Sequence, residues 1–368
     1  MIPVSEPLLD ERALAYVQEA MQTNWISSEG RFIAEFERSW ASYCGVAHGV
    51  AVCNGSAALE VAMQALELPP GSEVILPSFT IISCVAAVLR AGCHPVLVDC
   101  EPDTWCLDVT EVERKITART RAIMPVHMYG HMADMNPVME IARRFGLVVI
   151  EDAAEAHGAE YHGRRAGGIG TLGCFSFYAN KIVTTGEGGM VVTANPELAE
   201  RIRGLRNLAF GRDRRFLHTE LGHNFRMTNL QAAIGLAQVE RIENHLERKR
   251  KMAALYMNGL RDIHGLRLPV ERSGVKNVYW MYGVVLDDDV AMDATAFAAF
   301  LRKQGVDTRP FFLGMHEQPV LLERGLFKGE NYPVTERLAR RGLYLPSGLG
   351  ISEVQIDRVC TAVRGFFG

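Results

Sequence analysis

The sequence lacks the features by which membrane, secreted and nucleic-acid-binding proteins are usually recognised. None of its apolar runs approaches the roughly 20 residues of a membrane-spanning helix. Residues 1–20 contain no basic segment followed by an apolar one, so we expect no signal peptide. Lysine and arginine (39) nearly balance aspartate and glutamate (43), and the net charge of −4 argues against a surface for nucleic acid. We therefore expect a cytoplasmic protein with neither a membrane nor a nucleic acid as partner.

Paired cysteines are also missing. The eight cysteines include no Cys-x-x-Cys pair, and most of them lie in apolar runs, as reduced and buried thiols do. We expect neither a disulfide framework nor a metal site. The chain has 368 residues, 48% of them hydrophobic, which is enough for a large core and for two domains.

Between about residues 50 and 195, helix-like and strand-like patterns alternate. Strand patterns occur at 72–78, 94–100, 121–127, 147–152, 174–179 and 189–193, and helix patterns at 56–68, 84–92, 109–117 and 135–146. This alternation predicts βαβ units and an α/β fold with a mostly parallel central sheet covered on both faces. Ligands of such sheets bind at the carboxyl ends of the strands.

The pattern changes after residue 228. A long helical pattern, with room for one break, occupies 228–262, and an alternating strand pattern follows at 277–286. Further helices are predicted at 294–305 and 352–367. We expect residues 1–244 to form a large domain that includes the N-terminal segment, and residues 245–368 to form a smaller α+β domain.

One glycine-rich segment imitates a dinucleotide-binding motif. GIGTLG (168–173) matches G-x-G-x-x-G, which needs a strand before it and a helix after it. Here a polar loop precedes the segment and a strand pattern follows it. We therefore expect no nicotinamide cofactor.

A possible anion site occurs where a strand turns into a helix in AVCNGSAALEVAMQ (51–64). The backbone N–H groups of Gly55, Ser56 and Ala57 would face an anion at the N-terminus of that helix, together with the Ser56 hydroxyl. A serine that only caps the helix explains the same pattern equally well.

A carboxylate, Asp152, ends the almost wholly apolar strand of LVVIEDAAEAHG. A carboxylate in that place is costly unless a cation or several donors meet it. The protonated nitrogen of a pyridine ring would meet it, and the carboxylate would keep that nitrogen protonated. The alternative is an N-cap for a following helix.

A lysine follows the next strand, in FSFYANKIVTTGEGG (175–189), where Ser176 and Lys181 lie on either side of the strand end. A lysine partly removed from water has a lowered pKa and can condense with an aldehyde. The alternative is a solvated loop lysine. An anion-binding turn, an aspartate and a lysine, in this order on an α/β sheet, match what pyridoxal phosphate requires.

These segments are similar to those of a known family. NWISSEG, NGSAAL, PSFT, VHMYGH, EDAAEAHG, FSFYANKIVTTGEGGMVVT, HNFRMTNLQAAIGLAQ and DTRPFF occur in the family's order. Along essentially its whole length the chain resembles the pyridoxal-phosphate-dependent nucleotide-sugar aminotransferases of the DegT/DnrJ/EryC/StrS group. The resemblance implies the aspartate-aminotransferase-like fold, called fold type I.

The TTGEGG and RMTNLQAAIGLAQ segments most resemble members that aminate C4 of GDP-4-keto-6-deoxymannose with L-glutamate, in lipopolysaccharide O-antigen biosynthesis. A UDP- or dTDP-linked keto sugar remains the alternative substrate, and a regulator that keeps the fold without turnover is the alternative from another class.

The resemblance also implies roles for particular residues. Lys181 would be the Schiff-base lysine and proton carrier, Asp152 the partner of the pyridine nitrogen, and Glu155 a neighbour of the cofactor's phenolic oxygen. Gly55, Ser56 and Ser176 would hold the cofactor's phosphate. Asn224 would reach the phosphate bound by a neighbouring subunit, so a homodimer with shared active sites is implied.

Two positions depart from the family pattern. Ile81 stands where members usually have an aromatic residue that stacks on the cofactor ring, and stacking adds about 0.5–1.5 kcal/mol beyond burial. Ala179 stands where close relatives have glycine.

Several polar or aromatic residues have two open interpretations. His127, Tyr129 and His157 lie near strand ends and would either line the site or be buried and satisfied. Arg226 and Arg309 would bind a pyrophosphate or carboxylates, or form surface ion pairs. Trp25 is a candidate to cover the site from the N-terminal segment.

Overall fold

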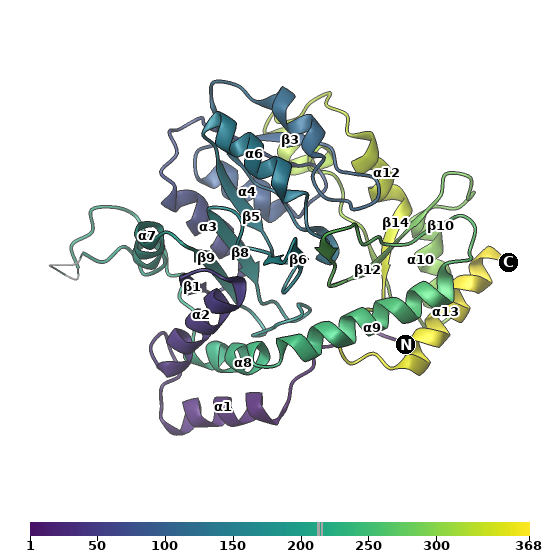
Figure 1. Ribbon diagram of the computed structural model, residues 1–368, viewed down its shortest axis with the longest axis horizontal. Helices are drawn as coiled ribbons and strands as arrows, with labels where there is room; N and C mark the ends of the chain where they lie inside the picture. Colours follow the sequence, from purple (N-terminus) through teal and green to yellow (C-terminus); the bar gives the residue numbers. More distant parts are fainter. Residues whose placement is uncertain (212–213, 215) are drawn as a thin grey trace.

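A seven-stranded sheet forms the centre of the protein (Figure 1). The computed structural model describes residues 1–211, 214 and 216–368. The strands follow the order β1-β9-β8-β5-β4-β2-β3, and β9 alone among them runs antiparallel to its neighbours. Their bounds are β1 His48–Val52, β2 Glu73–Pro77, β3 His94–Val98, β4 Thr120–Ile123, β5 Val148–Asp152, β8 Leu172–Ser176 and β9 Gly189–Thr193. The predicted α/β class and mostly parallel sheet are confirmed.

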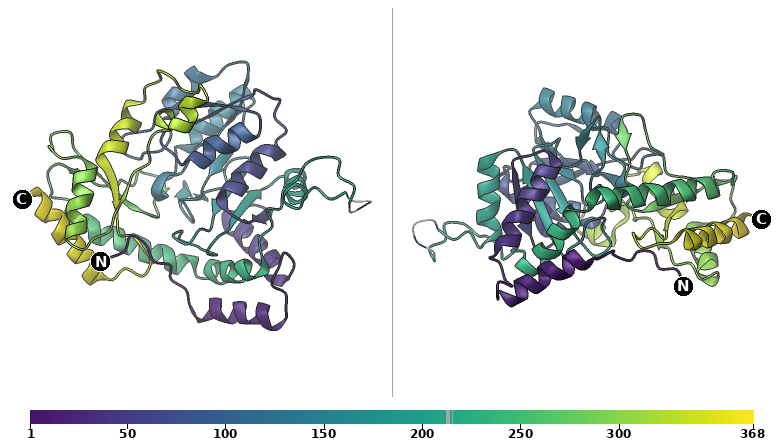
Figure 2. Two further views of the ribbon diagram at one scale, coloured as in Figure 1. Left: turned by 180° about the vertical axis from the view of Figure 1, so that it is seen from behind. Right: turned by 60° about the horizontal axis from the view of Figure 1, so that its bottom comes forward.

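Helices cover both faces of this sheet. Helices α3 (Gly55–Ala65) and α4 (Ile82–Arg90) pack together on one face, whereas α2 (Arg31–Cys44) and α6 (Met135–Phe145) lie on the other (Figures 1 and 2). Each strand of the sheet is buried along most of its length, as expected when both faces are covered. The remaining elements of this part are α1 Glu11–Gln22, α5 Val109–Val112, α7 Pro196–Arg206, β6 Glu160–Tyr161 and β7 Arg164–Arg165.

A second, antiparallel sheet of four strands lies toward the C-terminus in the order β10-β12-β14-β13. Its strands are β10 Leu266–Arg267, β12 Tyr282–Leu286, β13 Arg309–Pro310 and β14 Gly342–Leu345, and short β11 (Val275–Lys276) pairs with β6. The accompanying helices are α10 Ala294–Lys303, α11 Pro319–Glu323, α12 Pro333–Arg341 and α13 Glu353–Phe367.

The long helical pattern at 228–262 forms two helices. The break falls at residues 240–241, between α8 (Asn229–Val239) and α9 (Ile242–Leu260). Helix α9 extends from the large sheet to the C-terminal sheet along one side of the molecule (Figures 1 and 2). Two clusters of buried apolar residues lie at its two ends, and the second also contains Ile2 from the N-terminus. A domain boundary at residue 244/245 stays a prediction.

The strand predicted at 277–286 is shorter than expected. Strand β12 begins only at Tyr282, and the residues before it form a loop in which Tyr279 has φ +48°. The Val278 N–H donates to the Gly130 carbonyl at 3.1 Å, and a Cβ at Gly130 would lie 2.7 Å from the Trp280 nitrogen. The prediction failed because close approach to Gly130 diverts this apolar segment from the sheet toward the strand ends. No helix among the described residues is long and apolar enough to cross a membrane.

Candidate active site

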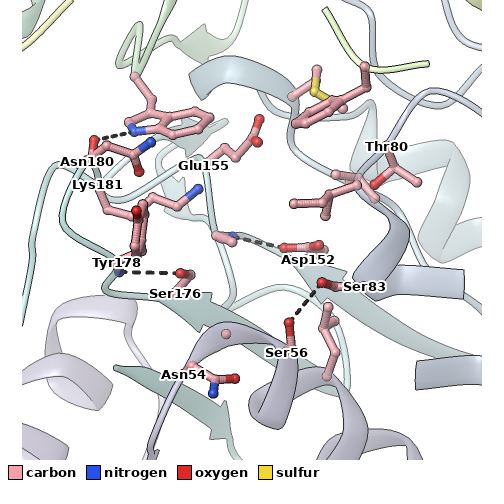
Figure 3. A pocket seen from close by; sticks show the side chains of 18 of the residues that line it. Asn54, Ser56, Thr80, Ser83, Asp152, Glu155, Ser176, Tyr178, Asn180 and Lys181 are labelled. Atoms are coloured by element: carbon pink, nitrogen blue, oxygen red, sulfur yellow. Dashed lines mark hydrogen bonds between the residues drawn. The ribbon is translucent and has the colours of Figure 1, made fainter. Parts of the chain in front are cut away.

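A cavity of about 530 Å³ opens at the carboxyl ends of β5 and β8. It is lined by Asn54, Gly55, Ser56, Leu59, Thr80, Ile81, Ser83, Val126, Met128, Asp152, Ala154, Glu155, Ser176, Tyr178, Asn180, Lys181, Glu187, Trp280, Phe312 and Tyr344. Figure 3 shows ten of these side chains labelled, with the Lys181 amine and the Asp152 carboxylate both directed toward the same space. The position matches the rule that ligands of parallel sheets bind at strand ends.

The floor of the cavity is the N-terminus of α3. Asn54 caps this helix, because its Oδ1 accepts the Ala57 N–H at 2.8 Å. The prediction that the Ala57 N–H faces an anion is therefore wrong, since the cap already occupies this donor. Ser56 is therefore not the cap, and its hydroxyl instead lies 2.8 Å from the Ser83 hydroxyl. Among the described residues, the N–H groups of Gly55 and Ser56 have no acceptor, which leaves them for an anion.

Close packing of α3 against β8 depends on a glycine. A Cβ on Gly55 would lie 2.6 Å from the Cβ of Ser176 and 3.0 Å from its Oγ. The absence of this side chain lets the Ser176 hydroxyl come beside the helix N-terminus. Three hydroxyls, of Ser56, Ser83 and Ser176, thus surround two free N–H groups.

Asp152 lines the same cavity at the end of β5 and is 3% exposed. Its Oδ1 accepts the Ala154 N–H at 3.1 Å, and its Oδ2 accepts the Cys84 thiol at 3.0 Å. Residues 153–159 form turns and no helix, so the N-cap alternative for Asp152 is wrong. A buried carboxylate with only these two donors still has capacity for a cationic N–H.

Lys181 is buried, and the turn after β8 folds back to hold it. The Lys181 N–H donates to the Tyr178 carbonyl at 2.9 Å, and the Thr184 hydroxyl donates to the Phe177 carbonyl at 3.1 Å. The Nζ lies 3.6 Å from the centroid of the Trp280 ring. Burial lowers the pKa of Lys181, although the carboxylates of Glu155 and Asp152 act in the opposite sense. The amine is thus poised to be neutral more readily than an exposed lysine.

Glu155 forms the third ionisable group of the cavity. Its Oε2 accepts the Tyr129 N–H at 2.9 Å, and Tyr129 adopts the strained φ of +49°. Burial raises the pKa of Glu155, while the nearby Lys181 amine and the Tyr129 N–H lower it. Two carboxyl groups and one amine, all removed from water, share one space.

The segment that imitates a dinucleotide motif (168–173) binds the protein's own Glu151 carboxylate, together with Gly167 just before it. The backbone N–H groups of Gly167, Ile169 and Gly170 donate to Glu151 at 2.9, 2.7 and 2.6 Å. His127 Nε2 lies 2.9 Å from the same carboxylate. Burial opposes ionisation of Glu151, but these hydrogen bonds outweigh it and hold the pKa below its ordinary value. His127 is therefore a buried, satisfied residue outside the cavity lining.

Two other candidates, His157 and Tyr129, also lie away from the cavity lining. His157 is packed among Trp40, Phe175 and Phe177, and burial lowers its pKa to about 3. The Tyr129 ring lies behind the cavity wall, 5.9 Å from the Phe312 ring.

Four further candidate residues lie outside the cavity of their own chain. Trp25 is 54% exposed, and Asn224 is also exposed. Arg226 donates to Asn207 Oδ1 at 2.6 Å, and Arg309 pairs with Asp307 at 2.8 Å. Within this chain, none of the four lines the cavity.

Sequence reasoning missed Ser83, Cys84 and Trp280. Ser83 and Cys84 directly follow Ile81 and Ile82 at the start of α4, so the PSFT segment was a signal that could have found them. Trp280 lay within an apparent strand and carried no signal of its own. Ile81 was expected and lines the cavity at 43% exposed.

The arrangement fits pyridoxal phosphate. The free N–H groups and hydroxyls at α3 suit a phosphate dianion, Asp152 suits a protonated ring nitrogen, and the buried Lys181 amine suits an aldehyde. The fold and this set of groups define a lysine-dependent pyridoxal-phosphate enzyme.

Sequence and structure comparisons with known proteins support the same enzyme class. Residues 7–364 match the DegT/DnrJ/EryC1/StrS aminotransferase family. The GDP-perosamine synthase of Caulobacter vibrioides is 43% identical over 364 residues, covering 98% of this chain and 97% of that protein. The GDP-perosamine synthase of Escherichia coli O157:H7 is 37% identical, covering 100% and 98%. The solved structure of the aminotransferase TlmJ from Streptoalloteichus hindustanus has a TM-score of 0.92 at 32% identity, covering 99% and 98%.

The chain belongs to the DegT/DnrJ/EryC1/StrS aminotransferase family. It is an aminotransferase that depends on pyridoxal phosphate.

Proposed function

We propose that the protein transfers the amino group of L-glutamate to C4 of GDP-4-keto-6-deoxy-D-mannose, which yields GDP-perosamine. The observation that carries the proposal is the meeting of Lys181 and Asp152 in one cavity with the free N-terminus of α3. The sugar rests on similarity, because relatives named for GDP-perosamine are 43% and 37% identical along the whole chain.

Bound pyridoxal phosphate supplies an aldehyde that accepts amino groups and a ring that withdraws electrons from the reacting carbon. The N–H groups of Gly55 and Ser56, with the three serine hydroxyls, would hold its phosphate. Asp152 would keep a proton on the ring nitrogen, because a buried carboxylate favours the cationic form of its partner. The Cys84 thiol and the Ala154 N–H fix the orientation of that carboxylate.

Lys181 would carry the proton between the reacting carbon atoms. Its lowered pKa lets the amine exchange a proton more readily than an exposed lysine does. Glu155 lies close enough to influence this amine by charge, and we propose that it also faces the phenolic oxygen of the cofactor. The Trp280 ring covers the amine and excludes water from one side.

We also propose a homodimer with shared active sites. Trp25 and Asn224 are exposed and lie outside the cavity of their own chain, so both are available to a partner's cavity. Ile81, Ile82 and Tyr178 are exposed apolar residues at or beside the cavity, where a second chain would cover them. Arg226 and Arg309 are the proposed contacts for the nucleotide pyrophosphate or the glutamate carboxylates. A cytoplasmic location and a place in O-antigen synthesis belong to the same proposal.

The test is the visible spectrum of the purified protein with pyridoxal phosphate, before and after adding L-glutamate. The proposal expects a band from lysine-bound cofactor that converts to a pyridoxamine-like band. GDP-, UDP- and dTDP-linked keto sugars are then added separately, and the sugar that restores the first band is identified by mass spectrometry of its product. Restoration by the UDP or dTDP sugar alone would overturn the GDP assignment. A bound cofactor that never responds to glutamate would instead indicate the non-catalytic regulator.

A further inference from the structure

A second lysine, Lys249, is buried outside the cavity and has no part in the chemistry described above. It lies in α9 and is 2% exposed. Its Nζ donates to the carbonyl oxygen of Trp280 at 2.7 Å and also to that of Ser347. Among the described residues, no carboxylate pairs with this amine, and burial lowers its pKa to about 7. Keeping such a lysine in the core costs stability, so its two contacts call for an explanation.

The first contact leads directly to the active site. Trp280 precedes β12, so its carbonyl lies outside the strand and accepts from Lys249. At the other end of the same residue, the indole N–H donates to the Asn180 carbonyl at 2.8 Å. The centroid of the ring between these two anchors lies 3.6 Å from Lys181 Nζ.

We infer that Lys249 is a positioning residue for amino transfer, which holds the Trp280 indole over the Lys181 amine by fixing the Trp280 backbone. The inference rests on the proposed role of Lys181. Trp280 touches the reacting amine, whereas Lys249 acts only through Trp280. The Trp280 ring keeps water from the Lys181 amine. If the ring is displaced, water can solvate the ammonium form, and the pKa of Lys181 should rise.

The charged groups facing the Lys181 amine are Glu155 and Asp152, and both raise its pKa. Burial outweighs them in the intact protein. If the Trp280 ring moves, burial, the largest cause of the lowered pKa, weakens while both carboxylates remain. The attraction between the ammonium and the indole face is lost as well, but it is smaller than the burial effect, so we expect the pKa of Lys181 to rise. The neutral amine, which reacts with an aldehyde, would then appear at higher pH.

The experiment measures how fast pyridoxal phosphate bonds to Lys181 in cofactor-free protein, followed by visible absorbance across a pH series. Borohydride reduction and mass spectrometry of the Lys181 peptide confirm the attachment site. We expect Lys249→Met to shift the pH midpoint upward by about one unit and to lower kcat about tenfold or more, with little change in the KM for glutamate. Lys249→Gln, which keeps a donor, should shift less and serves if the methionine variant does not fold.

Tyr256→Phe is the matched control. The Tyr256 hydroxyl donates from the same helix to the Pro346 carbonyl at 2.8 Å, next to Ser347, without contacting Trp280. Its loss should leave the pH midpoint unchanged. An equal shift in the control would mean that Lys249 is merely structural and would overturn the inference.

A double-mutant cycle with Trp280→Leu tests the connection. If Lys249 acts through Trp280, the double variant should shift no further than Trp280→Leu alone. Additive shifts, or a normal profile in both Lys249 variants, would overturn the inference while leaving the proposed function intact. Failure of the wild-type protein to attach cofactor at Lys181 would overturn the proposed function and this inference with it.

Discussion

The Sγ of Cys84 lies 3.0 Å from Oδ2 of Asp152 and donates a hydrogen bond to it beneath the cavity. Burial raises the pKa of the Cys84 thiol well above its ordinary value, and the Asp152 charge acts in the same direction. The thiol therefore keeps its proton and remains a donor. Asp152 has one fixed donor on each oxygen, which leaves its outer lone pairs directed at the cavity.

We expect Asp152→Asn to bind pyridoxal phosphate but to turn over at least about a hundredfold more slowly, because an amide does not hold a proton on the ring nitrogen. Cys84→Ala removes only a weak donor and should cost less than about tenfold. Steady-state kinetics with visible spectra of the bound cofactor would check both. Near-normal rates for the asparagine variant would contradict the role given to Asp152.

Gly55→Ala should weaken cofactor binding about tenfold or more. The new Cβ would lie 2.6 Å from the Ser176 Cβ and would push β8 from α3, and such overpacking costs about 1–3 kcal/mol. The dissociation constant measured by fluorescence titration tests this expectation. Gly204→Ala is the control, since this glycine lies in α7 with nothing within 4 Å of an added Cβ. It should leave binding unchanged and raise stability by about 0.5–1 kcal/mol.

Glu151→Ala should lower the free energy of unfolding by about 3 kcal/mol or more, because three backbone N–H groups, two of them buried, lose their acceptor together with His127. Urea unfolding measures the loss. The control is Glu113→Gln, an exposed residue paired with Arg144, which should change stability by less than about 1 kcal/mol.

Because the pKa of Glu151 is lowered in the folded state, the contribution of Glu151 to the free energy of unfolding should depend on pH. Its folded pKa lies below the ordinary 4.5, so its contribution is complete above that value and is lost as the pH falls. The stability difference between the wild type and Glu151→Ala should therefore shrink in acid. A difference that stays constant with pH would contradict the ionised state of Glu151.

The buried Lys249 should make the stability of the folded protein depend on pH at neutral to alkaline pH, whereas Glu151 acts in acid. The pKa of Lys249 is lowered from 10.5 to about 7, so the unfolded chain binds more protons than the folded one between these values. The wild type should gain stability relative to Lys249→Met as the pH rises across this interval. The gain is on the order of 3–5 kcal/mol, since one pKa unit corresponds to about 1.4 kcal/mol. Urea unfolding of both proteins at several pH values would show it, and parallel curves would contradict it.

The central sheet could be predicted from the sequence because each of its strands and turns is marked by a pattern within a few neighbouring residues. Asp152 ends an apolar run, and the Asn54-Gly55 turn separates a strand from a helix; both features are visible over a few residues. The polar surroundings of GIGTLG correctly excluded a dinucleotide site. They did not show that its N–H groups bind Glu151, because that contact joins two segments that become neighbours only in the folded sheet.

The roles of Cys84, Lys249 and Trp280 depend on distant contacts. Lys249 lies in the basic run 247–251, a composition typical of a solvated helix face, but its Nζ reaches carbonyls that lie 31 and 98 residues away. Trp280 alternates with its neighbours as strand residues do, and only the approach of Gly130 moves it out of the sheet. Trp25 and Asn224 remain predictions, since their proposed contacts belong to a second chain.

The N-terminal Ile2 lies in the C-terminal core, and its N–H donates to the Gly305 carbonyl at 2.7 Å. That core also contains Val359 and Val363 from α13. During synthesis, Ile2 therefore cannot pack into this core until Val363 has emerged from the ribosome. The large sheet, complete by residue 193, has its strands long before then. We expect nascent chains to form the large sheet first and the C-terminal core only after release from the ribosome. A protein fused to the N-terminus should therefore perturb the C-terminal core, which forms last.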